Sequence, residues 1–133
     1  THARCCSVLR KSGGYDRAKI DYSALSDEAS SALVKAIAEF PAAVSEAAEK
    51  YEPYIISRSV INVCSCFNKF YYDNRIMDEN EGVRNARLAL TDAARNVIKT
   101  GLYLVGLEAP AQLSPSIRRK KHCSISNEFA QKP

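Results

Sequence analysis

An apolar stripe with helical spacing is the feature that most limits what this chain can fold into. Between residues 53 and 76, large apolar side chains recur at alternating steps of four and three positions: Ile56, Val60, Val63, Phe67 and Phe70. This spacing places all five on one face of a single long α-helix. Such a face is stable when it is buried, so the stripe predicts a helix packed into a core.

A second stripe of the same kind predicts another long helix, from residue 81 to about residue 103. Gly106 lies just beyond its expected end, where a glycine commonly follows a helix. The members of this stripe are Ala86, Leu90, Ala93, Val97 and Leu104. We expect this face to be buried as well.

Three shorter segments also follow a helical pattern. Residues 1–10 look like the end of a helix. Ser26 is a suitable N-cap for a helix over residues 26–39, and Pro41 suits the first turn of a helix over residues 41–52. No alternating strand pattern competes with these segments. The sequence therefore predicts an all-α bundle of about five helices with short connections.

The positive charge of the chain is concentrated near its C-terminus. The formal net charge is +4, yet residues 1–113 hold 14 basic and 14 acidic side chains. We predict one domain over residues 1–113, followed by a basic tail over residues 114–133. The tail's Ser, Pro and basic content favours a flexible segment, and its run Arg118–Lys121 either adds nonspecific RNA affinity or is simply solvated. Any nucleic-acid binding by the domain itself must use local patches.

The cysteines argue against a metal centre. Their spacings are C-C and C-x-C, unlike the paired C-x-x-C of zinc sites, and the chain has two histidines. We expect no metal and reduced, partly buried thiols in an intracellular, cytoplasmic protein. No apolar run approaches eighteen residues, so we expect no membrane association. The N-terminus lacks a signal-peptide core and does not begin with Met, which suggests the interior of a longer chain.

The stretch "CSCFNKFYYDNRI", residues 64–76, carries four aromatic rings on one predicted helix. Phe67 and Phe70 belong to the apolar stripe. Asn68, Tyr71 and Arg75, with Tyr72, share a flank at spacings of three and four. This flank is either an edge tyrosine with its hydroxyl in water, or an amide, a ring and a guanidinium that stack on and hydrogen-bond an unpaired RNA base.

A row of mostly basic side chains falls within about 120° on the last predicted helix. We expect this row to lie opposite the apolar stripe. It is either a solvated charged face or a stripe that contacts RNA phosphates. Its members are Arg84, Arg87, Thr91, Arg95 and Lys99.

Four segments are distinctive in combination: "HARCCSVLRKSG" from residue 2, "FNKFYYD" at 67–73, "ARLALTDAAR" at 86–95 and "GLYLVGLEAP" at 101–110. Together they resemble the C-terminal anticodon-binding domain of arginyl-tRNA synthetase. The resemblance runs in order from His2 to about Leu113 and implies an all-α bundle that grips the anticodon stem and loop of tRNA(Arg). It departs at "APAQL", where family members commonly have "APERM", and in the tail, which has no counterpart.

The resemblance implies recognition by the His-Ala-Arg helix, by the end of the Phe-Asn-x-Phe-Tyr helix and by the extreme C-terminus of the domain. Together with the basic row, this gives the predicted RNA-binding residues: His2, Arg4, Asn68, Tyr71, Arg75, Arg84, Arg87, Arg95 and Leu113. We predict no catalytic residue among them.

The resemblance also implies a partner domain. An upstream catalytic domain of the same chain would bind ATP and magnesium and attach arginine to tRNA. Residues 1–133 contain neither a glycine-rich phosphate loop nor the nucleotide-binding signatures of such enzymes. We therefore expect no catalysis and no cofactor in this segment alone, and a monomer. The alternative is a non-catalytic helical module retained for complex assembly.

Overall fold

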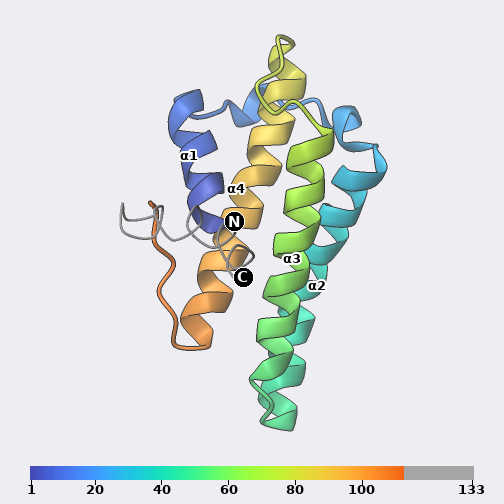
Figure 1. Cartoon of the computed structure of the whole chain (residues 1–133). Coiled ribbons are helices and arrows are strands. Elements are labelled where there is room, and N and C mark those ends of the chain that lie inside the picture. Colours follow the sequence, from blue (N-terminus) through green and yellow to red (C-terminus); the bar gives the residue numbers. More distant parts are fainter. Residues whose placement is uncertain (113–133) are drawn as a thin grey trace, which may run out of the picture.

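The computed structural model describes residues 1–112, which form four α-helices, two short 3-10 helices and no strand. The all-α prediction is confirmed. The long helices are shown in Figure 1 and have these bounds: α1 His2–Ser12, α2 Glu28–Lys50, α3 Tyr54–Asp73 and α4 Glu81–Leu104. The 3-10 helices η1 Arg17–Lys19 and η2 Tyr22–Leu25 lie in the connector between α1 and α2.

Four helices replace the predicted five because the two segments expected on either side of Pro41 are one helix, α2. The prediction of a new helix beginning at Pro41 is wrong. A proline inside a helix removes one backbone hydrogen bond and costs about 3 kcal/mol. Phe40 before the proline and Ala47 after it are both buried, so continuous packing of α2 along its neighbour offsets this cost.

The start of α2 also differs by one residue from the prediction. Asp27, not Ser26, is the N-cap, and its carboxylate accepts a hydrogen bond of 3.0 Å from the backbone N–H of Ser30. The Ser30 hydroxyl and the Asn74 amide also donate to this carboxylate. Although burial opposes the charged form, these bonds hold the pKa of Asp27 below its usual value.

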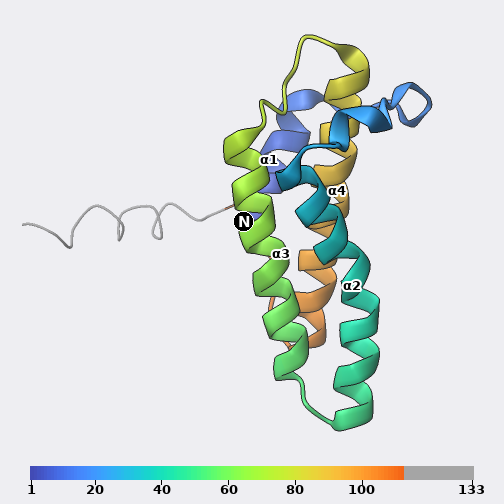
Figure 2. The same cartoon turned by 90° about the vertical axis from the view of Figure 1, so that its right-hand side faces the viewer.

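The α2–α3 pair and α1 pack against different sides of α4. α2 and α3 make a long antiparallel hairpin, which extends below the other helices in Figures 1 and 2. α4 packs against α3, and α1 packs against α4 on the other side. The connector passes the first turn of α4, where the backbone N–H of Asp21 donates to the carbonyl of Gly82 at 3.2 Å.

The apolar stripe of α3 forms the centre of the core, as predicted. Val63, Phe67 and Phe70 are fully buried, and Ile56 and Val60 are nearly so. The Phe67 and Phe70 rings contact each other at a centroid distance of 6.2 Å.

The stripe predicted on α4 is only partly correct. Ala86 and Leu90 are buried, but Ala93 and Val97 are half-buried and Leu104 is exposed. The buried face lies one residue further round the helix, on Thr91, Ala94, Ile98 and Gly101.

Close approach of the helices explains this rotation of α4. A Cβ at Gly101 would lie 2.2 Å from Cγ2 of Val60 and 3.2 Å from the Phe40 ring. Gly101 of α4 therefore faces α2 and α3, whereas Val97 packs at the edge of the core and Leu104 is exposed. Within residues 1–112, no helix combines the length and hydrophobicity needed to cross a membrane.

Candidate nucleic-acid interface

Three of the predicted site residues come together where the start of α1 reaches the C-terminal half of α3. The Nη1 of Arg4 donates a hydrogen bond of 2.8 Å to Oδ1 of Asn68. The guanidinium carbon of Arg4 lies over the Tyr71 ring, 5.3 Å from its centroid. All three side chains are exposed, Tyr71 to 41%. We call Arg4, Asn68 and Tyr71 the Arg–Tyr cluster.

The cluster rests on buried neighbours in both helices. Next to Arg4, Cys5 is fully buried, and burial raises the pKa of its thiol to about 12. Cys5 is thus a neutral packing residue that holds α1 against the core. Under Tyr71, the buried Phe67 ring lies at a centroid distance of 6.1 Å. The exposed cluster is therefore held in position by the core below it.

The charge of Arg4 is not neutralised within the cluster. Its partners are a neutral amide and an aromatic face, whose negative quadrupole attracts the guanidinium without cancelling its charge. Arg4 therefore remains a cation at the surface, with donors and a planar face available to a ligand.

A groove of about 660 Å³ adjoins the cluster, and Arg4 forms part of its wall. It lies between the first turns of α1, the middle of α3 and the end of α4, with residues 110–112 at its rim. Val60, Ile61 and Leu102 supply apolar lining and Arg10 adds a second arginine, and no carboxylate among residues 1–112 lines the groove. A groove of this size and composition can hold a planar apolar group that carries negative charge.

His2 is buried in the wall of this groove, with 8% of its surface exposed. Its Nδ1 lies 3.1 Å from the carbonyl oxygen of Pro110, to which the protonated Nδ1 donates. The ring thereby ties the chain after α4 to the start of α1. This contact gives His2 a structural task, and its predicted role in RNA binding stays a prediction. Leu113 lies outside the described residues.

Arg75 does not occupy the position that helical spacing predicted. α3 ends at Asp73 instead of Ile76, because Asn74 adopts an extended backbone at φ −118° and ψ 130°. Arg75 therefore lies in the loop that follows the helix, with its side chain exposed. The loop over residues 74–80 is called the α3–α4 loop below.

The basic row on α4 is not the single exposed face that was expected. Thr91 is fully buried, and its hydroxyl donates to the carbonyl of Arg87 at 2.8 Å. Only 16% of the Arg87 side chain is exposed, and it pairs with Asp78. Arg95 pairs with Asp92 at 2.7 Å, whereas Lys99 is exposed. The expectation fails because the buried face of α4 includes Thr91.

Two polar residues that sequence reasoning missed organise the α3–α4 loop. Asp78 bonds to Arg87, and Asn74 donates to Asp27 at 3.1 Å. The Asp78-Glu79-Asn80 sequence just before α4 is a recognisable signal for an Asx turn leading into an N-cap. The partner of each side chain lies on another segment, so spacing along the chain could not identify it.

Comparison with known proteins gives a consistent family assignment. The DALR anticodon binding domain family matches residues 1–113. The arginine–tRNA ligases of Clostridioides difficile and Enterococcus faecalis are 42% and 44% identical over 113 residues, and that of Ignicoccus hospitalis is 40% identical over 114 residues. Each alignment covers 85% of this chain, but only 18–20% of the relative's length.

The chain therefore spans about a fifth of the length of these relatives. The helical architecture, the aromatic end of α3 beside Arg4 and the match over residues 1–113 agree with one another. The chain belongs to the DALR anticodon binding domain family.

Proposed function

We propose that this chain is the tRNA-binding part of an arginine–tRNA ligase and that the Arg–Tyr cluster contacts the anticodon loop of tRNA(Arg). The observation that carries the proposal is the Arg4–Asn68–Tyr71 arrangement, which joins a cation, an amide and an aromatic ring on one exposed surface. Unpaired bases are recognised by stacking on rings or guanidinium planes and by hydrogen bonds to their edges.

The position of Arg4 determines which surface of the cluster is open to a base. Arg4 covers one face of the Tyr71 ring, and Phe67 lies on the core side of that ring. A base therefore stacks most readily on the outer plane of the guanidinium, with Tyr71 as the support below it. The free donors of Arg4 then face the sugar–phosphate backbone. In this arrangement Arg4 contacts the RNA and Tyr71 holds Arg4 in the stacking orientation.

The adjoining groove suits a second unpaired nucleotide. Its apolar floor matches the faces of a base, and Arg4 and Arg10 supply positive charge at its wall. The domain thus needs no overall basic surface, which agrees with the balanced charge of residues 1–113.

The relatives are named as ligases, so we extend the proposal to the whole protein. An upstream catalytic domain would bind ATP and magnesium and charge the tRNA, and the present segment would position it. The fragment alone is expected to be inactive, monomeric and cytoplasmic. The alternative of a retained assembly module gains no support from these relatives.

The proposal is tested by titrating the 133-residue chain into a labelled RNA hairpin carrying the anticodon stem and loop of an arginine tRNA. We expect tighter binding to this hairpin than to one with altered anticodon bases. Arg4→Met should weaken binding about tenfold or more and reduce the salt dependence, because it removes a stacking plane and a cation. Equal affinity for both hairpins, or an unchanged affinity in Arg4→Met, would contradict the proposal.

A further inference from the structure

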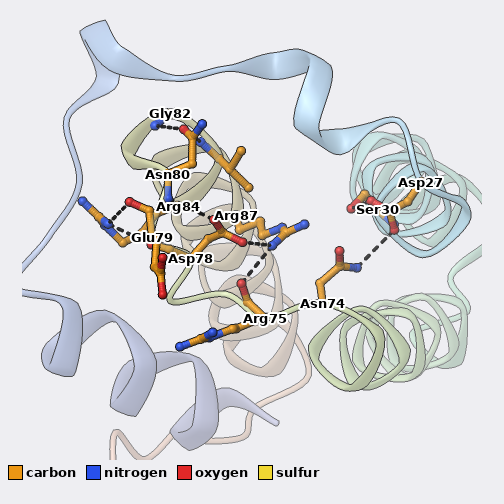
Figure 3. Close-up of polar contacts among 11 residues, drawn as sticks. Asp27, Ser30, Asn74, Arg75, Asp78, Glu79, Asn80, Gly82, Arg84 and Arg87 are labelled. Carbon is orange, nitrogen blue, oxygen red and sulfur yellow. Dashed lines mark hydrogen bonds and ion pairs between the residues drawn. The ribbon is translucent and has the colours of Figure 1, made fainter.

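The backbone of the α3–α4 loop is anchored at successive residues. Asn74 donates to the carboxylate of Asp27 at 3.1 Å. Arg87 Nη1 donates to the carbonyl oxygen of Arg75 at 2.9 Å, and Ile76 is buried with 5% of its surface exposed. Figure 3 shows the hydrogen bonds from Asn74 to Asp27 and from Arg87 to Arg75. The loop thus leaves α3 along a fixed path.

Asp78 closes the other half of the loop. Its Oδ1 accepts from the backbone N–H of Asn80 at 3.0 Å, and its Oδ2 accepts from Arg87 Nη1 at 3.2 Å. Arg84 adds a donor to the Asp78 carbonyl at 2.8 Å. The Arg87–Asp78 pair is largely shielded, with 16% and 32% of the two side chains exposed. Shielding makes such a pair more effective than an exposed ion pair.

The Arg75 side chain, unlike its backbone, is not held by the contacts that fix this loop. It is exposed, and within residues 1–112 its guanidinium makes no hydrogen bond or ion pair. In Figure 3 it extends away from Arg87, although its own carbonyl faces Arg87. A cation without a partner, on a backbone fixed on both sides, is preorganised to bind an anionic ligand.

We propose that Arg87 and Asp78 are positioning residues, which hold the α3–α4 loop so that Arg75 is presented to the RNA backbone. This proposal rests on the proposed function and assigns Arg87 a different task from phosphate contact. Arg87 acts through the carbonyl of Arg75 and through Asp78, and Arg75 makes the contact. A looser loop must be ordered when RNA binds, which costs free energy, although no charge is removed from the protein surface that faces the RNA.

The test is a double-mutant cycle in the 133-residue chain, with the arginine anticodon hairpin as the probe. Arg75→Gln removes the presented charge, and Arg87→Met removes both of the donated bonds. We expect each single variant to weaken binding about three- to tenfold. In the Arg75→Gln background, Arg87→Met should have no further effect, because the group it positions is already absent.

Two further variants support the cycle. Asp78→Asn removes the negative charge of the ion pair but keeps the shape of the side chain. It replaces Arg87→Met if that variant does not fold. In the Arg75→Gln background, Asp78→Asn should then cause no further loss of RNA affinity. Arg58→Met is the matched control, an exposed arginine at the other end of α3, and its affinity should equal that of the wild type. Circular dichroism melts establish that each variant is folded.

If the losses of RNA affinity in the two single variants multiply in the double variant, Arg87 acts independently of Arg75, which would overturn the proposal. An unaffected Arg75→Gln or Arg87→Met would overturn it as well. If the wild type then still prefers the matched hairpin and Arg4→Met still weakens binding, the proposed function survives. If the wild type does not distinguish matched from altered hairpins, the proposed function itself fails, and the positioning role fails with it.

Discussion

The two ends of α3 each carry an arginine over a tyrosine ring, but the two pairs are built differently. Near the start of the helix, Arg58 lies 5.9 Å from the Tyr54 ring centroid, four residues away in the same helix. Near its end, Arg4 of α1 lies 5.3 Å from the Tyr71 ring and is also bonded to Asn68. Seventeen positions along a helix separate the two tyrosines by about 25 Å.

The difference shows what turns a common surface contact into a candidate binding site. Arg58 and Tyr54 meet because residues four apart on any helix are neighbours. Arg4 and Tyr71 meet because α1 and α3 both pack against α4, and the Asn68 side chain then fixes the guanidinium. Only the second pair has its arginine oriented by neighbours on a different helix. We therefore expect RNA binding at the end of α3 and none at its start.

We expect the largest loss of stability from a change to Phe67, the buried ring beneath Tyr71. Phe67→Ala removes a fully buried ring that lies 6.1 Å from Tyr71. Loss of its packing should lower the free energy of unfolding by about 3–5 kcal/mol. Urea unfolding followed by circular dichroism measures this change. Ile61→Ala on the same helix, where the side chain is 65% exposed, is the control and should change stability by less than about 1 kcal/mol. Similar losses in both variants would contradict the placement of the core.

A smaller loss is expected where α4 crosses the first half of α3. Gly101→Ala places a methyl group against Val60 and Phe40, with the closest contact at 2.2 Å. Overpacking costs about 1–3 kcal/mol, and the better helix propensity of alanine offsets at most about 1 kcal/mol of it. We expect net destabilisation with RNA affinity unchanged in the folded fraction. A more stable variant would show that α4 is not in close contact here.

The smallest effect concerns the bonds that tie the end of α3 to the start of α2. Asp27→Ala removes the N-cap and the acceptor of Asn74, and should cost about 1 kcal/mol at neutral pH. Because the folded pKa of Asp27 is below its ordinary value of 3.8, its contribution is complete above about pH 5. It is lost as the pH falls through the folded pKa.

Asp27→Asn separates the cap from the charge. Asparagine also caps helices well, so this variant should be close to the wild type in stability at neutral pH. Its stability should fall less than that of the wild type between pH 5 and pH 3. Thermal melts at a series of pH values provide the comparison, and parallel curves for the two proteins would show that the carboxylate is not stabilised by folding.

Sequence patterns predicted the parts of this fold that depend on local spacing. The stripe on α3 is buried in full because five large apolar residues leave no other orientation. The stripe on α4 was placed one residue too far round because its apolar residues are small or widely spread. Its orientation follows instead from Gly101, whose importance appears only when Val60 and Phe40 are next to it. Pro41 was given too much weight because tertiary packing along α2 offsets its local cost.

The candidate site was predictable as a set of residue types, but not as an arrangement. The resemblance identified Arg4, Asn68 and Tyr71, and the fold brings these three together. The basic row on α4 was grouped by angle alone, so the burial of Thr91 and the pairing of Arg87 with Asp78 could not be foreseen. Contacts between segments far apart in sequence decide which charges remain available to a ligand.

We expect the Arg–Tyr cluster at the end of α3 to bind RNA and the similar pair at its start not to bind it. The most direct measurement compares Tyr71→Ala with Tyr54→Ala in titrations against the arginine anticodon hairpin. Both tyrosines are exposed and both contact an arginine, so the variants are closely matched. We predict that Tyr71→Ala weakens binding about tenfold to a hundredfold, because Arg4 loses the ring that holds it in its stacking orientation, and that Tyr54→Ala leaves binding unchanged. Equal affinities of the two folded variants would show that the Arg–Tyr cluster does not bind the RNA.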